Sequence, residues 1–297
     1  MEKHMESEIA AINQQSLKDK IKSYMKHPGS FILLLLVLIA AVLTVGVLVF
    51  LVGYILIRGI PYLKPSLFAW TYNSDNVSML PAMINTLFMT VLALLLSVPF
   101  SVGAAIYLVE YAKKGNKLVG IIRVTAETLS GIPSIIYGLF GMLFFVTALK
   151  WGYSMMAGAA TLAIMVLPVI MRTTEEALLC VPDSFREGSF GLGAGKLRTI
   201  FKIVLPSAIP GILSGIILAI GRIVGETAAL IYTSGTVANL AGFFDSGRTL
   251  AIHMYSLSRE GMHTNEAYAT AVVLLVVVLI INGVSSLIAK KFEAPKQ

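Results

Sequence analysis

Two ionisable residues, Arg222 and Glu226, interrupt a long apolar stretch of this sequence. An ionisable group inside a hydrophobic segment is costly, so it marks a candidate functional site with a partner to be identified. Because the two residues are four apart, they would share one face of a helix and could form an ion pair. Arginine also suits an anion path, since its planar guanidinium stays charged and binds oxyanions in a fixed geometry. Two interpretations stay open, a structural ion pair and the polar wall of an anion pathway.

The other residues that could do chemistry are few and scattered. Arg172 ends another apolar stretch, where it could anchor the chain to lipid headgroups. Arg123 and Glu127 are four apart, and we interpret them as a surface ion pair. His253 and His263 have no clustered carboxylates nearby, so we expect no metal site. The single cysteine cannot form a disulfide within the chain.

The run Gly193-Ala-Gly-Lys196 is similar to part of a phosphate-binding loop. That loop needs a further glycine before this run and a serine or threonine after the lysine. This chain has Phe190 and Leu197 at those positions. We therefore expect the chain to bind no nucleotide and no cofactor of its own, and to catalyse no reaction.

The composition indicates a polytopic α-helical membrane protein. Hydrophobic residues make up 57% and charged residues 13% of the 297 residues, against about 45–50% and about 25% in soluble domains. A helix that crosses a bilayer needs about 20 mostly apolar residues. Six runs meet this length, and we expect an interfacial helix before the third. The predicted spans are residues 31–57, 84–107, 132–149, 153–171, 209–232 and 267–289.

The distribution of lysine and arginine predicts the orientation of these spans. With the N-terminus inside, the inner segments carry 17 basic residues and the outer segments carry five. Positive residues favour the cytoplasmic side, so we expect a cytoplasmic segment 1–30, a transmembrane domain 31–289 and a cytoplasmic tail 290–297. The net charge of +7 then reflects orientation and headgroup contact, and no basic stripe with interleaved aromatic residues suggests nucleic acid.

One inner connection, residues 173–208, is much longer than the other cytoplasmic turns. Asp183 or Ser184 after Pro182 could cap a helix, which the glycines at 193–195 would end. Apolar residues at three- and four-residue spacing then predict a second, amphipathic helix from Leu197 onward. Two helices joined by a glycine turn would form a rigid protrusion, either a structural plug or a docking element for a partner.

The residues of this protrusion resemble the "EAA" signature of permease subunits in binding-protein-dependent ABC importers. The matching positions are Glu187-Gly188-Ser189, Gly193 and Leu205-Pro206, with Gly and Ser in place of the usual pair of alanines. The resemblance implies the type I ABC importer permease fold. It also implies that this segment is a coupling helix that docks in a groove of an ATPase subunit.

Three further runs resemble the phosphate-specific permeases of the A type. They begin at Gly131-Ile-Pro133, at Arg172-Thr-Thr-Glu-Glu and at Gly221-Arg222, the last including Glu226-Thr-Ala. The resemblance implies that Arg172, Arg222 and Glu226 belong to the phosphate path of a multi-pass protein of the bacterial inner membrane.

The same resemblance implies a set of partners. These are a homologous C-type permease, two ATPase subunits that hold ATP and Mg, and an extracytoplasmic phosphate-binding protein. Two alternatives stay open from the sequence: a permease for another oxyanion such as molybdate or sulfate, and a secondary transporter driven by an ion gradient.

Overall fold

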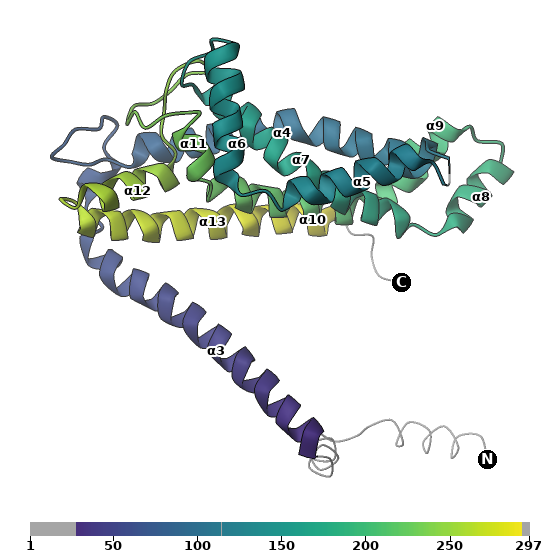
Figure 1. Ribbon diagram of the computed structural model, residues 1–297, viewed down its shortest axis with the longest axis horizontal. Helices are drawn as coiled ribbons and strands as arrows, with labels where there is room; N and C mark the ends of the chain where they lie inside the picture. The colour runs from purple at the N-terminus through teal and green to yellow at the C-terminus, as the bar shows by residue number, and fades with distance from the viewer. Residues whose placement is uncertain (1–27, 114, 293–297) are drawn as a thin grey trace. The chain divides into compact units, whose positions relative to one another are not determined.

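The computed structural model describes residues 28–113 and 115–292, and every regular element in these ranges is helical (Figure 1). The predicted cytoplasmic segments 1–30 and 290–297 lie mostly outside these ranges, because residues 1–27 and 293–297 are not described. The α-helices are α3 (Pro28–Gly59), α4 (Leu80–Ile106), α5 (Lys117–Ser130), α6 (Ser134–Gly141), α7 (Met155–Leu179), α8 (Asp183–Gly191), α9 (Lys196–Thr199), α10 (Leu205–Val224), α11 (Ala228–Ile231), α12 (Leu250–Glu260) and α13 (Thr264–Phe292). Short 3₁₀ turns η1 (Ile60–Tyr62) and η2 (Pro65–Phe68) and π-helical segments η3 (Tyr107–Tyr111), η4 (Met142–Ala148) and η5 (Ile200–Val204) extend or connect them.

Among the described residues, five helices are long and apolar enough to cross a membrane, and a bent pair supplies a sixth candidate. The pair joins α5 to α6 and η4 across Gly131–Pro133 with a bend of 101°, and Figure 1 shows α6 standing across the direction of α5. A proline cannot continue the preceding helix, and it disfavours helical geometry in the residue before it. With this bent pair counted as one span, the predicted number of six spans is confirmed, and the predicted helix before the third span is α5, the first arm of the pair.

Residues 1–57 and residues 58–297 form two separate units. In the first unit, the described part of α3 has no charged residue between Phe31 and Ile57, and its large side chains are exposed. Its most apolar window has a mean hydropathy of 3.3. A helix that is apolar on all sides requires lipid or other helices around it.

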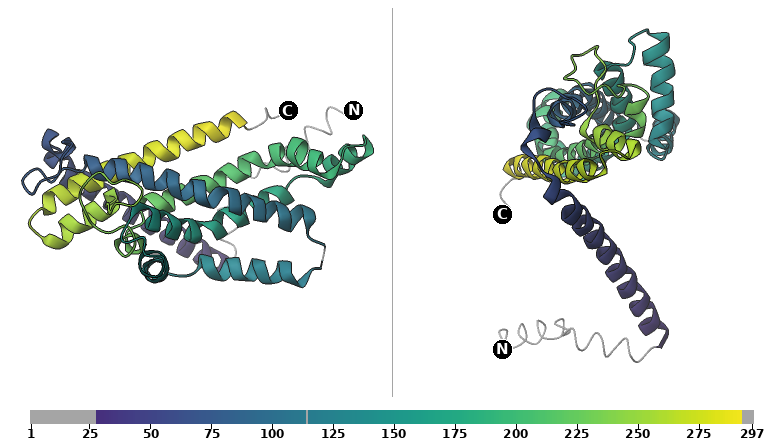
Figure 2. Two further views of the ribbon diagram at one scale, coloured as in Figure 1. Left: turned by 90° about the horizontal axis from the view of Figure 1, so that it is seen from above. Right: turned by 90° about the vertical axis from the view of Figure 1, so that its left-hand side faces the viewer.

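The second unit is a helical bundle built around α7. This helix packs against α4 and α10, and α10 in turn contacts α13. The left view of Figure 2 shows the long helices of this unit running alongside one another. The first turns of α7 carry Ala157-Gly-Ala-Ala160, and small residues let membrane helices approach closely. The resulting core contains Met89, Leu162, Met165, Ile170 and Ile223, all buried.

The long inner connection is more helical than predicted. The helix α7 continues beyond Met171 to Leu179, and the predicted second helix of the protrusion runs without a break through α9 and η5 into α10. The predicted second helix is therefore present, and it continues directly into the fifth span. Pro206 does not interrupt this helix and directly follows the π-helical segment η5 and Leu205. Membrane helices tolerate a proline when local π-helical adjustment re-satisfies the freed backbone groups.

The predicted cap of the first protruding helix is also wrong. The helix α8 starts after Pro182, and no side chain caps its first turn. The carboxylate of Asp183 instead accepts a hydrogen bond from Arg186 at 3.2 Å. The glycine turn is confirmed, since Gly193 has a φ of +81° and follows α8 directly.

Glycines of α10 set the distance between α10 and α7. A Cβ at Gly211 would come within 2.5 Å of the Ala177 side chain, and one at Gly215 would collide with Thr173. The sequence spacing predicted this close approach. The second glycine pair behaves differently, because a Cβ at Gly221 would meet nothing within 4 Å.

This difference gives a matched test of the packing. Gly215→Ala should destabilise the protein by about 1–3 kcal/mol, because the new methyl group overpacks the contact with Thr173. Gly221→Ala, on the same helix but in open space, should be neutral or gain up to about 1 kcal/mol from helix propensity. Thermal unfolding in detergent measures both, and equal stability of the two variants would contradict the packing of α10 on α7.

Candidate functional site

Arg222 lies in the last turn of α10 and lines a hollow of about 520 Å³ beside this helix. The hollow is formed by Val169, Ser214, Ile217, Leu218, Gly221, Arg222 and Asn282, so α7 and α13 contribute to it as well. Within residues 28–113 and 115–292, the Arg222 guanidinium has no hydrogen bond and no ion pair. An unpaired cation on an apolar helix is costly, which makes this hollow the strongest candidate for an anion site.

The expected ion pair between Arg222 and Glu226 is not formed. The helix α10 ends at Val224 and Gly225 caps it, so Glu226 no longer shares a helix face with the arginine. The Glu226 carboxylate instead accepts hydrogen bonds from the amides of Thr227, at 3.2 Å, and Ala229, at 3.0 Å. It is buried to 8% exposure and satisfies the start of α11. The structural interpretation of this pair is therefore wrong.

Asn282 is a polar residue of the hollow that our sequence analysis missed. It lies in the middle of α13, and its Oδ1 atom is buried without a hydrogen-bond partner. The amide of an asparagine offers two N–H donors and one acceptor, and such a group within a membrane helix needs a partner or a ligand. The isolated Asn in the last apolar run was the available signal.

Arg172 lies on α7 three residues after Val169, and it does not itself line the hollow. It is 57% exposed and contacts Glu176 at 3.3 Å and Glu127 at 3.6 Å. Arg123 of α5 pairs with Glu175 of α7, whose side chain is 9% exposed. The predicted Arg123–Glu127 pair is therefore wrong, because each of these residues pairs with α7. Two ion pairs thus connect α5 to α7, and Arg172 is not among the residues that line the hollow beside Arg222.

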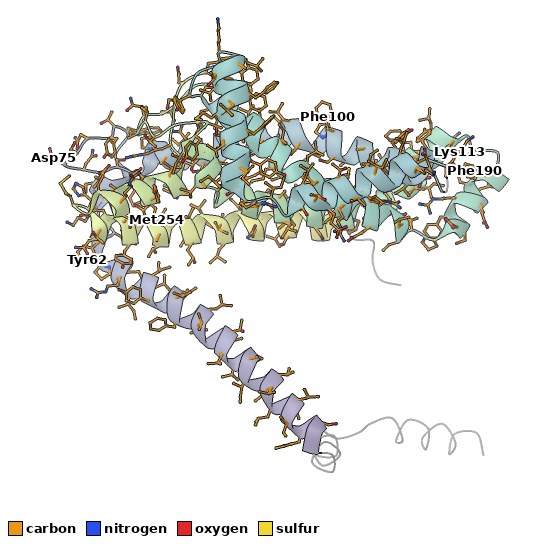
Figure 3. All side chains as sticks on the ribbon, viewed as in Figure 1. Tyr62, Asp75, Phe100, Lys113, Phe190 and Met254 are labelled. Atoms are coloured by element: carbon orange, nitrogen blue, oxygen red, sulfur yellow. The ribbon has the colours of Figure 1, made fainter. Side chains whose placement is uncertain are left out.

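The protrusion consists of α8 and the turn that follows it. Figure 3 shows Phe190 of this segment at the same end of the bundle as Lys113, away from Tyr62 and Asp75. Leu192 is 91% exposed at the tip. Other large apolar side chains are exposed beside it, namely Phe185, Phe190 and Leu197.

The predicted coupling residues differ in their exposure. Glu187, Gly188 and Gly193 lie on the exposed surface of the protrusion. Ser189 is buried, and its hydroxyl hydrogen-bonds the Thr199 hydroxyl at 2.8 Å. Leu205 and Pro206 begin α10. The three exposed residues could contact a partner, whereas Ser189, Leu205 and Pro206 hold the protrusion to the spans.

Comparison with known proteins shows which family has this architecture. The family model described as binding-protein-dependent transport system inner membrane component matches residues 97–294. The chain belongs to this family. It is therefore a transport subunit and a multi-pass protein of the inner membrane.

Individual relatives and solved structures agree with this membership. A probable ABC transporter permease of Bacillus subtilis is 34% identical over 280 residues, 86% of this chain and 95% of that protein. The phosphate transport system permease protein PstA 1 of Mycobacterium tuberculosis is 36% identical over 211 residues, 70% of this chain and 69% of that protein. A bacterial alginate ABC transporter has the same fold, with a TM-score of 0.67 at 15% identity, covering 90% of this chain and 97% of that one.

In this permease the protrusion is fixed to two spans through Arg186. Its Nε and Nη2 atoms donate to one carboxylate oxygen of Glu110 at 3.0 and 2.8 Å. Its Nη1 and Nη2 atoms donate to the carbonyls of Val181, at 2.7 Å, and Leu178, at 2.9 Å. Glu110 ends the α4 span, and Leu178 lies near the end of α7. Motion of α8 would therefore be transmitted directly to both spans. No sequence pattern predicts this contact, because the two partners are 76 residues apart.

Loss of the Arg186 contacts should weaken the protein. The Glu110–Arg186 pair is 8% and 14% exposed, and removing one partner of a buried ion pair costs about 3 kcal/mol or more. We expect Arg186→Met to lower the thermal unfolding midpoint markedly in detergent. The additional change Glu110→Gln should restore part of the loss, and Arg198→Met, which alters an exposed residue of α9, should have little effect. A neutral Arg186→Met variant would show that the protrusion is held in another way.

Proposed function

We propose that this chain is the A-type permease subunit of an ATP-driven importer of inorganic phosphate. The observation that carries the proposal is the unpaired Arg222 on a hollow lined by three membrane helices. Similarity to proteins named phosphate transport system permease protein PstA, at 36% identity in two of them, supports phosphate as the cargo.

The proposed assembly pairs this chain with a homologous C-type permease, so that the two subunits enclose the path. Two ATPase subunits would bind on the side of the protrusion and hold ATP and Mg. A phosphate-binding protein would dock on the opposite, extracytoplasmic side. Both termini of the chain would then be cytoplasmic, as the distribution of lysine and arginine predicts.

In this mechanism, closure of the ATPase pair pushes α8, and the Arg186 contacts carry that motion to α4 and α7. The path opens outward, accepts phosphate from the binding protein, and resets after hydrolysis. Arg222 lowers the electrostatic barrier for an anion that crosses the apolar part of the path. A path must bind its ion weakly enough to release it, so most of the affinity should reside in the binding protein.

Arg172 has a different role in this proposal. Its exposed guanidinium at the inner end of α7 is shared between Glu127 and Glu176. Two weak, exposed ion pairs leave it free to exchange partners. It would attract phosphate at the cytoplasmic exit, while Glu226 would hold the break between α10 and α11 in place.

Replacement of Arg222 tests the anion path. Arg222→Met should reduce phosphate uptake by about 10- to 100-fold or to background, because charge-assisted hydrogen bonds to an oxyanion are worth about 1.5–3 kcal/mol. Glu226→Gln keeps the acceptor oxygen that caps α11 and should retain uptake. Uptake of radiolabelled phosphate in cells and co-purification with the partner subunits measure activity and assembly. Near-normal uptake by a well-assembled Arg222→Met variant would contradict the proposal.

Competition experiments separate phosphate from the other oxyanions. In cells that depend on this importer, excess unlabelled phosphate should suppress uptake of the label, whereas molybdate and sulfate should not. Equal suppression by sulfate or molybdate would favour the alternative cargo while leaving the permease assignment intact.

The turn after α8 tests the coupling role. Gly193 has a φ of +81° and Gly195 has a φ of −74°, and neither has a neighbour within 4 Å of an added Cβ. Gly193→Val should distort the turn, since a β-branched residue is strained at positive φ by about 1–2 kcal/mol or more. We expect the complex that contains Gly193→Val to hydrolyse ATP without driving phosphate uptake.

Gly195→Val is the matched control and should transport normally, because its backbone conformation is open to any residue. Both activities are measured on the purified complex in proteoliposomes. Tight coupling in Gly193→Val, with the ATPase still bound, would contradict the assignment of the coupling segment.

A further inference from the structure

The first turn of α12 carries a group of buried polar side chains that transport, as proposed above, does not use. We call Arg248, Thr249 and His253 the α12 cluster; Figure 1 shows α12 at the opposite end of the bundle from α8. The Nδ2 atom of Asn85 donates to the Arg248 carbonyl at 3.2 Å, and the Thr86 hydroxyl accepts from the first amide of α12 at 2.8 Å. The start of α12 is thus fixed to α4.

Most of the unsatisfied polar atoms of the protein lie in this cluster. Among the described residues, eight buried side-chain atoms lack a hydrogen-bond partner, and five of them are Nε and Nη2 of Arg248, Oγ1 of Thr249 and both ring nitrogens of His253. The three residues are 5%, 2% and 0% exposed. Buried polar atoms are almost always satisfied, and each exception needs an explanation. Five exceptions within six residues set this cluster apart from the other described residues.

The charge of the cluster is also uncompensated. In the described part of the chain no carboxylate pairs with Arg248. The Tyr72 ring lies 4.5 Å from its guanidinium, but a cation–π contact recovers only about 2 kcal/mol, less than the several kcal/mol that burial of an ion costs.

His253 faces the same Tyr72 ring from 6.1 Å. Burial, together with the charge of Arg248, lowers the pKa of His253 to about 3. The imidazole is therefore neutral at physiological pH and retains one N–H donor. The Val77 backbone approaches the ring without forming a well-aligned hydrogen bond.

The helix end adds further donors. The helix α12 has 11 residues, and its N-cap residue Thr249 makes no capping hydrogen bond. The amides of Ala251 and Ile252 meet no acceptor in the described chain. Helix N-termini carry partial positive charge and free N–H groups, and they bind anions for this reason.

We propose that the α12 cluster binds one small inorganic anion. The guanidinium of Arg248, the hydroxyl of Thr249, the neutral His253 and the free amides of α12 would supply donors from several directions. The half-buried Tyr72 would move aside to admit the ion and would cover it afterwards. The anion would balance the charge of Arg248 and fix the outer loop on α4.

Other sources of compensation fit less well. A side chain of a neighbouring subunit is larger than a small inorganic anion and would need a wider opening than movement of Tyr72 to reach the orphan atoms, each of which exposes less than 1 Å². Water could accept some of the hydrogen bonds, but it would leave the charge of Arg248 unbalanced. The inference is independent of the cargo, so its failure would leave the Arg222 proposal untouched.

Anion-dependent stability tests this site. The full-length protein, purified in detergent with its co-purifying subunits, is unfolded by heat at constant ionic strength in isethionate, chloride or phosphate. We expect chloride or phosphate at saturation to raise the unfolding midpoint by about 5 °C relative to the bulky isethionate. The anion whose effect on the unfolding midpoint saturates at the lower concentration is the preferred ligand, either the halide or the oxyanion cargo.

Variants assign the effect to the cluster. Arg248→Gln should abolish the anion dependence, and Arg259→Gln, an exposed arginine of the same helix, should keep it. If Arg248→Gln does not fold, Thr249→Val tests the site instead. Loss of the hydroxyl should raise the anion concentration at the titration midpoint by at least about threefold. Absence of an anion effect in the wild type, or an unchanged effect in Arg248→Gln or Thr249→Val, would overturn the proposal.

Discussion

The permease depends on one constraint: a charge inside the bilayer needs a partner, and Arg222 has none among the described residues. Three buried carboxylates of the bundle have partners of their own. Glu226 caps α11, Glu175 binds Arg123, and Glu110 binds Arg186. The cost of leaving an arginine unpaired in a membrane helix is about 2.5–3.5 kcal/mol on insertion scales. The hollow beside Arg222 is also lined by the polar residues Ser214 and Asn282. This cost has a functional explanation, because an anion in transit would meet a charge that no protein group already neutralises.

The same constraint explains the inner end of the bundle by contrast. There Arg186 uses three nitrogen atoms on two carboxylates and two carbonyl groups, so it acts as a fixed connection. An arginine with satisfied donors transmits force, whereas an arginine with free donors attracts a ligand. The α12 cluster resembles the second case, but it is closed off from the membrane hollow and lies at the other end of the bundle.

The sequence predicted the spans and the protrusion because both depend on local features. Apolar run length defined the six spans, and Gly193 predicted the turn that its positive φ confirms. Ion pairs were predicted poorly. The Arg222–Glu226 pair requires a continuous helix, and Gly225 ends α10 between the two residues. The Arg123–Glu127 pair is not formed, because each residue pairs with a residue of α7 instead. Sequence spacing carries no information about such contacts between helices. The Arg186–Glu110 contact could not be predicted for the same reason.

Access to the hollow tests the central claim most directly. The chain has one cysteine, Cys180, which is exposed, so Cys180→Ala provides a cysteine-free background in which Ser214→Cys places a thiol in the hollow. In the assembled complex during ATP turnover, we expect this thiol to react with an anionic methanethiosulfonate reagent, and we expect excess phosphate to slow the reaction. The reaction should also slow when Arg222→Met is added. A thiol that never reacts while the same complex imports phosphate would contradict the account.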